Sequence, residues 1–464
     1  MNKMKALLAA LVLLASCGQK GGSEDVNYFP KLVEEVKVEG ELQAEKIIID
    51  NDNRKITIHF PLNSNPEAVS LDFVLAEGAD IVKSTAENGY FNLTKANAIF
   101  INFRDTEYRY VILSIYKDEE EQESLMREGP VNDMALLYYG GSHRPNQWEN
   151  PALQSNVSYT DLDGVEHWLF DSFLFLEFNA GNGRYFESGY DNGENTDGIA
   201  ARKEDWKAIL DKYFAEDGPI ARLNTVISNT ATRIGAPKYK RRLVIFIPAA
   251  FYLQTNWGEL NGKALDFSVT EDRVAASLWW VDYAIEKFNS LNLKYLSFDG
   301  IYYVAEQLTN NRQYLPELAS EIKKKGLKFY WIPYWQADGM GEWKAMGFDE
   351  AFLQPNYFFH QQKPDYQSYF DSVMGYAQAH GMSLEMEFDE RGLKQSTADY
   401  RADRLWDYLK AFQSYEVAKN NHVAYYQSDT MVHALHCSSD EDDQALYHEL
   451  CSFILSRQQA KGEN

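Results

Sequence analysis

From residue 133 onward, the chain alternates short apolar segments with longer amphipathic ones, and this alternation restricts the possible folds more than any other feature. Apolar runs of strand length between helical patterns indicate a parallel sheet whose strands are connected by helices. Eight strands are predicted, at residues 134–139, 168–178, 243–248, 295–303, 328–334, 350–354, 383–389 and 423–427. Helices are predicted at 203–215, 220–234, 272–291, 314–325, 366–380, 402–419 and 440–456.

This order of elements predicts the α/β fold class, as a (β/α)8 TIM-like barrel over residues 131–458. Eight strands with helical connections in one segment of this length match that architecture. A doubly wound sheet is the main rival, and it normally carries a glycine-rich phosphate loop after its first strand. The corresponding stretch, residues 138–142, reads Tyr-Tyr-Gly-Gly-Ser, which is not such a loop.

Residues 30–118 have a different pattern and predict a small all-β domain. Apolar and polar residues alternate in runs at 33–38, 46–49, 55–60, 70–75, 98–103 and 108–116. Short strands with turns at this spacing are typical of an immunoglobulin-like sandwich. All ten tryptophans of the chain lie after residue 140, so a spacer role is favoured over glycan binding for this domain. The acidic segment at 119–130 is the predicted linker.

The first 17 residues have the features of a bacterial lipoprotein signal peptide. Lys3 and Lys5 precede an apolar run at 6–14, which is too short to span a membrane. Leu-Ala-Ser-Cys at 14–17 matches a lipobox, which predicts cleavage before Cys17 and lipidation of its thiol. Residues 18–29 then form a tether. We expect an outer-membrane lipoprotein, and the sequence leaves open whether it faces the periplasm or the cell surface.

The composition excludes several classes of partner. A formal net charge of −24 makes DNA, RNA and anionic glycans poor ligands and favours neutral or cationic ones. Cys437 and Cys451 either form a disulfide or remain free thiols. The histidines show no paired metal-ligand spacing. A hairpin turn is favoured over a calcium loop for the Asp/Asn-rich stretch at 50–53, and a flexible loop for 191–198, which lacks the Glu that closes an EF-hand. The sequence predicts no metal and no cofactor.

The most informative strand lies in residues 382–391, Met-Ser-Leu-Glu-Met-Glu-Phe-Asp-Glu-Arg. Glu385, Glu387 and Asp389 alternate there with apolar side chains. A strand of an α/β protein is covered on both faces, so these carboxylates must face an enclosed polar cavity. Desolvated carboxylates that lie close together are suited to acid–base and nucleophilic chemistry.

The active site of such a barrel lies at the carboxyl ends of its strands. Amides, phenols, indoles and carboxylates occur at six of the predicted strand ends, and this mixture binds sugar hydroxyls and stacks on pyranose rings. The predicted substrate-binding residues are Glu385, Asp389, Tyr139, His143, Trp148, Trp331, Trp335, Asp338, Gln354, Asn356, Tyr357, Tyr426 and Gln427. Trp148, Trp335 and Trp343 are candidate stacking platforms, and packing under a long loop is the alternative for each.

Hydrolysis of a glycosidic bond requires two carboxyl groups on either side of that bond. Glu387 is the predicted catalytic member from the strand at 383–389, with Glu385 one layer deeper as its support. The partner is either Glu306, just beyond the strand at 295–303, or Asp299 within that strand. The sequence does not choose between these two residues.

Five motifs carry a resemblance to a known family: Gly-Ile-Tyr-Tyr at 300–303 with Glu306, Trp-Ile-Pro-Tyr at 331–334, Gln-Pro-Asn-Tyr at 354–357, Glu-Met-Glu-Phe-Asp at 385–389 and Tyr-Tyr-Gln at 425–427. They resemble DUF4855, an uncharacterised family of bacterial lipoproteins with a glycosidase-like barrel, associated with glycan utilisation. The likeness covers about residues 130–455. It implies a glycan ligand and partner proteins of a glycan-uptake system, but no established reaction. The strand at 295–303 lacks the Asn-Glu pair found in the largest group of barrel glycosidases.

Two functions remain open. The first is a lipid-anchored glycoside hydrolase that acts on neutral or amino sugar oligosaccharides by a two-carboxylate mechanism. The second is a non-catalytic glycan-binding lipoprotein of a polysaccharide-utilisation system. An enzyme of this kind requires both carboxyl groups, whereas a binding protein tolerates the loss of one of them.

Overall fold

The computed structural model describes residues 31–51, 54–104, 106–116, 131–141, 144, 148–190, 195–291, 293–396 and 399–461. The predicted signal peptide, tether and linker lie outside these residues, and so do Cys17 and His143. Within the described ranges, no helix combines the length and the apolar character needed to cross a membrane. No disulfide joins Cys437, which is exposed, to Cys451, which is buried.

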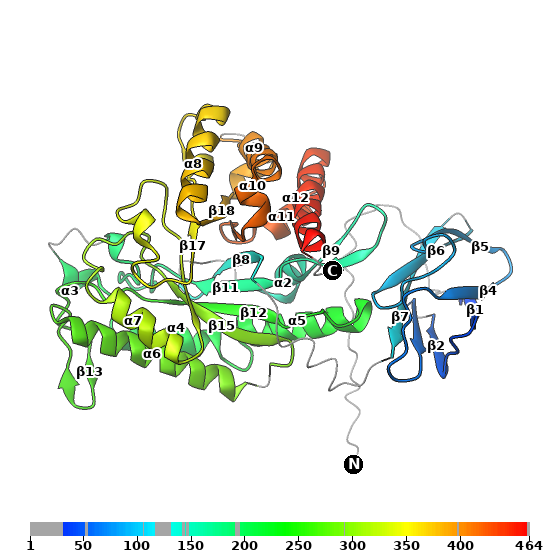
Figure 1. The fold of residues 1–464 in the computed structure, drawn as a ribbon, viewed down its shortest axis with the longest axis horizontal. Helices are drawn as coiled ribbons and strands as arrows, with labels where there is room; N and C mark the ends of the chain where they lie inside the picture. Colours follow the sequence, from blue (N-terminus) through cyan, green and yellow to red (C-terminus); the bar gives the residue numbers. More distant parts are fainter. Residues whose placement is uncertain are drawn as a thin grey trace, which may run out of the picture.

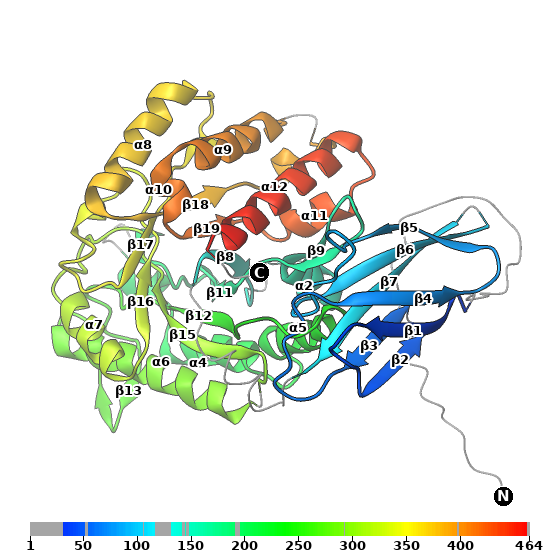
Figure 2. The ribbon, with the colours of Figure 1, turned by 45° about the vertical axis from the view of Figure 1, so that its right-hand side comes forward.

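The N-terminal domain consists of two β-sheets around one apolar core (Figures 1 and 2). The first sheet pairs β1 (Val33–Glu39) with β4 (Ser70–Leu75). The second has the order β2 (Lys46–Asp50), β3 (Lys55–His59), β7 (Thr106–Ile115), β6 (Asn97–Phe103) and β5 (Ala79–Ser84), and β3 runs parallel to β7. The predicted small all-β domain is confirmed. The sequence pattern misses β5, because all its residues after Ala79 are exposed and do not alternate.

The C-terminal domain is a closed barrel of eight parallel strands. In chain order, the strands are β8 (Asp133–Tyr138), β11 (Ser172–Leu176), β12 (Arg241–Ile247), β15 (Leu296–Tyr303), β16 (Lys328–Trp331), β17 (Glu350–Leu353), β18 (Ser383–Glu387) and β19 (Val423–Tyr426). The pairing of β19 with β8 closes the barrel. The predicted TIM-like barrel and the positions of its eight strands are therefore confirmed.

Helices connect the strands and cover the outside of the barrel (Figure 1). They are α2 (Asn150–Val157), α3 (Thr196–Ile199), α4 (Lys203–Tyr213), α5 (Pro219–Ile234), α6 (Thr270–Ser290), α7 (Leu315–Lys324), α8 (Tyr366–His380), α9 (Ala402–Ser414), α10 (Glu416–Asn420), α11 (Met431–Cys437) and α12 (Glu441–Ala460). The helix predicted at 402–419 is divided in two, because Tyr415 has an extended backbone.

Shorter elements complete the connections. Two hairpins pair β9 (Ser158–Thr160) with β10 (Glu166–Trp168) and β13 (Glu259–Leu260) with β14 (Lys263–Ala264). The 3-10 turns are η1 (Ser188–Tyr190), η2 (Met340–Glu342), η3 (Tyr357–Phe359) and η4 (Glu390–Gly392). β16 and β17 are joined through η2 without an α-helix.

The amino end of the barrel is held by a buried ion pair. Arg457 of α12 donates from Nε to Asp133 Oδ1 at 2.7 Å, and the Tyr425 hydroxyl donates to the same oxygen at 2.7 Å. Removal of one partner of such a buried pair strongly destabilises the folded protein, because it leaves the other charge buried and unpaired. These groups are engaged with one another, so they are structural rather than available to a ligand.

Candidate active site

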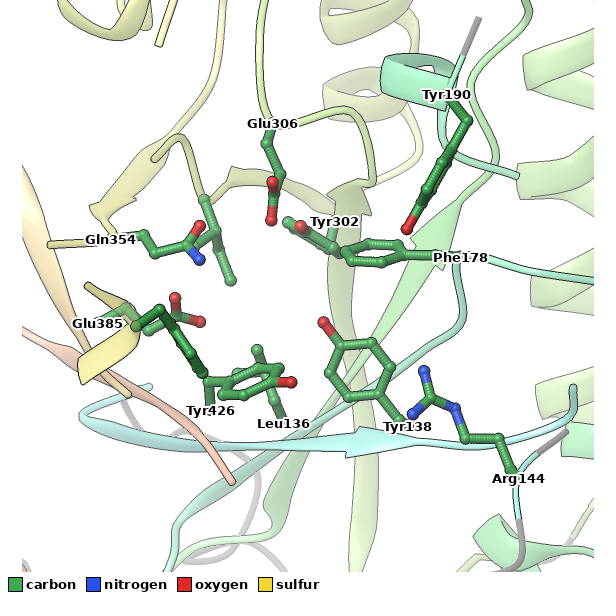
Figure 3. A pocket seen from close by; sticks show the side chains of 12 residues that line it. Leu136, Tyr138, Arg144, Phe178, Tyr190, Tyr302, Glu306, Gln354, Glu385 and Tyr426 are labelled. Atoms are coloured by element: carbon green, nitrogen blue, oxygen red, sulfur yellow. The ribbon is translucent and has the colours of Figure 1, made fainter. Parts of the chain in front are cut away.

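A cavity of about 320 Å³ lies at the carboxyl ends of the barrel strands (Figure 3). Parallel strands bring these ends to one rim, so residues far apart in the sequence meet there. The size is at the lower end of the range for small-molecule sites. The lining residues are Leu136, Tyr138, Arg144, Phe178, Tyr190, Tyr302, Glu306, Ile332, Gln354, Phe359, Glu385 and Tyr426.

Glu306 reaches the cavity from the segment that follows β15 (Figure 3). The preceding peptide is fixed by Trp331, whose Nε1 donates to the Ala305 carbonyl at 2.7 Å. Burial raises the pKa of Glu306 to about 8, and the negative charges of Glu187 and Glu387 add to the effect. Glu306 is therefore protonated at neutral pH.

Glu385 reaches the cavity from β18, on a different side from Glu306 (Figure 3). Its side chain is only 2% exposed, and the described residues donate no hydrogen bond to its carboxyl group. Burial raises the pKa of Glu385 well above its usual value, and the charges of Glu387 and Glu306 raise it further. A carboxyl group without a donor at such a position is costly unless it holds a proton or meets a ligand.

Glu387 lies on the same strand but does not line the cavity. Three donors surround its carboxylate: the Tyr408 hydroxyl at 2.6 Å, Gln354 Nε2 at 3.1 Å and the backbone N–H of Asn356. Burial raises its pKa to about 7, although these hydrogen bonds act to lower it. Asn356 has a φ of 61°, a left-handed conformation that asparagine tolerates well. Glu387 is thus a positioned group behind the cavity wall.

A fourth carboxyl group, Glu187, belongs to the same cluster although the sequence does not single it out. It lies in the segment between β11 and η1, and both its oxygens accept from the Gly189 N–H at 2.7 Å. Its side chain is 7% exposed, and burial raises its pKa to about 7. Its position in an irregular segment provides no periodicity from which to predict it.

Arg144 is the cation of the cavity wall, within the part of the chain that the structure describes. Its Nε donates to Glu177 Oε2 at 2.9 Å and its Nη1 to Asp429 Oδ1 at 3.1 Å. The guanidinium also lies 4.5 Å from the centre of the Tyr138 ring. Two carboxylates already balance this cation, so it is committed to the wall. Among the described residues, no group of three or more His, Cys, Asp or Glu side chains is arranged to hold a metal ion.

Tyrosine and phenylalanine form the aromatic wall of the cavity, and the tryptophans do not line it. Tyr138 makes edge contacts with Phe178 and Tyr426, at centroid distances of 5.5 and 5.6 Å. The Tyr138 and Tyr190 hydroxyls point toward the open space in Figure 3. Such rings offer both apolar faces and hydrogen-bonding tips.

Four of the predicted substrate or catalytic residues line the cavity, namely Glu306, Glu385, Gln354 and Tyr426. Glu387 and Asn356 form the layer behind it. Four other cavity residues could have been predicted, because they lie near the carboxyl ends of predicted strands: Tyr138, Phe178, Tyr302 and Ile332.

The remaining predicted residues have other partners. Trp148 is fully buried and its Nε1 donates to the Tyr138 carbonyl, whereas Trp331 stacks on Phe348 in the core. The other placements are Trp335 against Tyr376, Tyr139 against Tyr213, Asp338 with Arg312, Asp389 with Arg391, Tyr357 with Asp407 and Gln427 with Asn156. Trp343, a candidate stacking platform, is buried and donates to the His380 carbonyl.

Asp299 lies away from the cavity, in the first half of β15. Its carboxylate accepts from the Tyr330 hydroxyl and lies 3.7 Å from Arg242 and 3.6 Å from Lys328. A strand rises about 3.3 Å per residue, so a residue early in β15 cannot reach the rim where Glu306 lies. Of the two partners proposed from the sequence, the structure places Glu306 alone at the cavity.

Fold and cavity together define a (β/α)8-barrel protein with a pocket of buried glutamates and tyrosines at the carboxyl ends of its strands. Residues 133–452 match the family described as "Domain of unknown function (DUF4855)". The chain belongs to this family, whose description names no reaction. No curated protein matches the chain.

Solved structures similar to the chain are distant. A "putative glycoside hydrolase" from Bacteroides thetaiotaomicron is 16% identical over 21% of this chain and 28% of its own length, with a TM-score of 0.17. A GH18 chitinase, ChiB of Flavobacterium johnsoniae, is 9% identical over 71% and 95%, with a TM-score of 0.37. A mutant tryptophan synthase alpha-subunit from Pyrococcus furiosus is 10% identical over 70% and 98%, with a TM-score of 0.30. Such low scores carry no argument about function.

Proposed function

We propose that this protein is a glycoside hydrolase that acts on neutral or amino sugar oligosaccharides with two carboxyl groups. The observation that supports it most directly is the pair Glu306, from the segment after β15, and Glu385, from β18, which point into one cavity (Figure 3). Glycosidic hydrolysis requires a proton donor on one side of the bond and a carboxylate on the other. The four tyrosines of the wall offer hydroxyls and ring faces to a sugar.

Glu306 is suited to be the proton donor. Its raised pKa of about 8 keeps a proton on the carboxyl group at neutral pH, where a glycosidic oxygen needs one. The described residues make no hydrogen bond to this carboxyl group, so the leaving oxygen has no competitor for its proton. The Trp331–Ala305 hydrogen bond holds the segment that carries it.

Glu385 is the carboxyl group on the other side of the glycosidic bond, and the neighbouring Glu387 controls its protonation. Three donors stabilise the Glu387 anion, and this anion raises the pKa of Glu385. Once Glu385 has released its proton to solvent, its carboxylate acts as the nucleophile or as the base that activates water. A separation of about 5–5.5 Å between the two catalytic carboxyl groups gives retention, and about 6.5–9.5 Å gives inversion.

Glycan binding without cleavage is the second candidate, and the raised pKa of Glu385, which favours its protonated form, supports it. Two protonated carboxyl groups in an aromatic cavity bind sugar hydroxyls, but neither can act as a base. The two functions differ in what they require. Cleavage needs Glu306 and Glu385 together, whereas binding tolerates the replacement of either by an amide.

Release of reducing ends from a panel of oligosaccharides tests the proposal. Glu306→Gln and Glu385→Gln are each expected to lower kcat/KM about 10²- to 10⁴-fold, because each removes an essential proton transfer or attack. Glu317→Gln, the same change at an exposed position of α7, is the matched control and should retain full activity. Binding of a glycan without turnover of any member of the panel would replace the hydrolase proposal by the binding one.

The predicted lipid anchor suggests where in the cell this activity takes place. Lipidation at Cys17 would attach the chain to the outer membrane, and the N-terminal β-domain would hold the barrel away from the lipid surface. Proteins of a glycan-uptake system are the partners that such a location favours. The net charge of −24 supports the exclusion of nucleic acids and anionic glycans.

A further inference from the structure

We propose that the cavity selects a sugar that carries a free, protonated amine over the same sugar with an acetamide or a hydroxyl group at that position. This inference names the substrate class and rests on the proposed function only for the cleavage of such a sugar. It depends on three observations: the number of acidic groups around the cavity, the ion pairs that Arg144 already makes, and the absence of a described hydrogen-bond donor to Glu385.

Four glutamates form one cluster at the carboxyl end of the barrel. Glu306 and Glu385 line the cavity, Glu387 follows Glu385 two residues later on β18, and Glu187, in the segment before η1, acts electrostatically on Glu306. The charges of Glu187 and Glu387 raise the pKa of Glu306, and those of Glu387 and Glu306 raise the pKa of Glu385. A cluster of this composition repels anions and attracts a cation.

The described part of the wall does not supply that cation. Arg144 donates to both oxygens of Glu177 and to Asp429, so one positive charge already faces two negative ones. The Arg144 group as a whole therefore adds to the negative character of the cavity. Within the described wall, the counter-charge for a carboxylate formed at Glu306 or Glu385 has to come with the ligand.

Glu385 marks the position of that ligand. Glu385 is only 2% exposed, and its side chain points into the cavity (Figure 3). The described residues donate no hydrogen bond to its carboxyl group. An ammonium group offers three donors and a charge, whereas an acetamide offers one N–H and a hydroxyl one O–H. Charge-assisted hydrogen bonds to carboxylates are about twice as strong as neutral ones. An amine is thus the sugar substituent that this carboxyl group binds best.

Binding of an ammonium group has a measurable consequence, because it moves a proton. Besides the four glutamates, the titratable groups that the structure describes around the cavity are Tyr138, Arg144, Glu177, Tyr190, Tyr302, Asp389, Tyr408, Tyr426 and Asp429. Burial raises the pKa of these tyrosines, so they stay neutral near pH 7. Since these tyrosines do not take up the proton, a protonated glutamate that binds the ammonium group releases its proton to solvent and forms a carboxylate–ammonium pair. The same step creates the carboxylate that the hydrolytic mechanism requires.

Isothermal titration calorimetry with three matched probe series tests the inference. The probes are methyl glycosides of glucosamine and galactosamine, their N-acetyl forms, and the corresponding glucoside and galactoside, which differ only at C2. Titrations near pH 6, where the probe amine carries its proton, in two buffers of different ionisation enthalpy count the protons released. The full chain is used as wild type, as Glu385→Gln and as the control Glu317→Gln.

The amine probes are expected to bind at least tenfold more tightly than both counterparts, with release of about one proton. Glu385→Gln should reduce this preference at least tenfold and abolish the proton release, while the Glu317→Gln control keeps both. A thermal melt establishes that each variant is folded. Equal or tighter binding of the acetylated or hydroxyl probes, absence of amine binding, or an unchanged preference in Glu385→Gln overturns the inference.

The outcome is separable from that of the proposed function. Cleavage of N-acetylated or neutral oligosaccharides with no preference for amines would uphold the hydrolase and overturn this inference. Amine-selective binding that requires Glu385, without cleavage of any glycan, would uphold the inference and overturn the hydrolase.

Discussion

Replacing Glu187 with glutamine is expected to stabilise the barrel at alkaline pH and to have little effect in mild acid. Glutamine keeps an acceptor for the Gly189 N–H, so the local backbone retains its hydrogen bond. The substitution removes only the ability to ionise. Since Glu187 also raises the pKa of Glu306, the variant should lower that pKa and shift the alkaline limit of turnover to lower pH.

The size of the effect follows from the pKa of Glu187, which burial raises from 4.5 to about 7. The folded state therefore binds the proton more tightly than the unfolded state. Both states are protonated below about pH 4.5, and stability is then lost as the pH rises toward 7. Above about pH 7, the full loss in the free energy of unfolding that ionisation of Glu187 causes is reached. At about 1.4 kcal/mol per pKa unit, it amounts to about 3 kcal/mol, which Glu187→Gln should recover.

Urea denaturation followed by tryptophan fluorescence measures this difference, because all ten tryptophans lie after residue 140 and report on the barrel. The free energy of unfolding of Glu187→Gln should exceed that of the wild type by about 3 kcal/mol at pH 9 and by less than about 0.5 kcal/mol near pH 4.5. Comparing the two proteins at each pH cancels the other titrating groups. A gain of equal size at both values, or no gain at pH 9, would refute the electrostatic account of the cluster.

Three further substitutions test other parts of the description. Trp331→Phe removes the hydrogen bond to the Ala305 carbonyl and should cost about 1 kcal/mol of stability and about tenfold in kcat, measured by denaturation and by turnover. Asp299→Asn leaves Arg242 with one fewer counter-charge and should cost about 1–3 kcal/mol while turnover is unchanged; a loss of turnover would return Asp299 to the mechanism. Cys17→Ser should move the protein from the membrane fraction to the soluble one, which cell fractionation detects.

Local patterns in the sequence predict most of the fold. The eight barrel strands are recognisable as short, almost fully buried apolar runs, and the main helices by their amphipathic period; both signals depend on neighbours in the chain. The site is predicted in part for the same reason: Glu306 follows a strand, and Glu385 lies within one. β5 and Glu187 are missed, since an exposed edge strand and an irregular segment have no such period.

The sequence by itself determined that carboxyl groups of the strand at 383–389 would be enclosed, because a strand of a barrel has no face open to water. Only the tertiary structure decided which of them faces the cavity. Glu385 and Glu387 occupy the same face of β18, and no local pattern distinguishes them. Tyr408, from a helix that follows the strand, and the residues after β17 donate to Glu387 and leave Glu385 facing the cavity. Hydrogen-bond partners are chosen by distance in space, and that choice depends on the closed barrel.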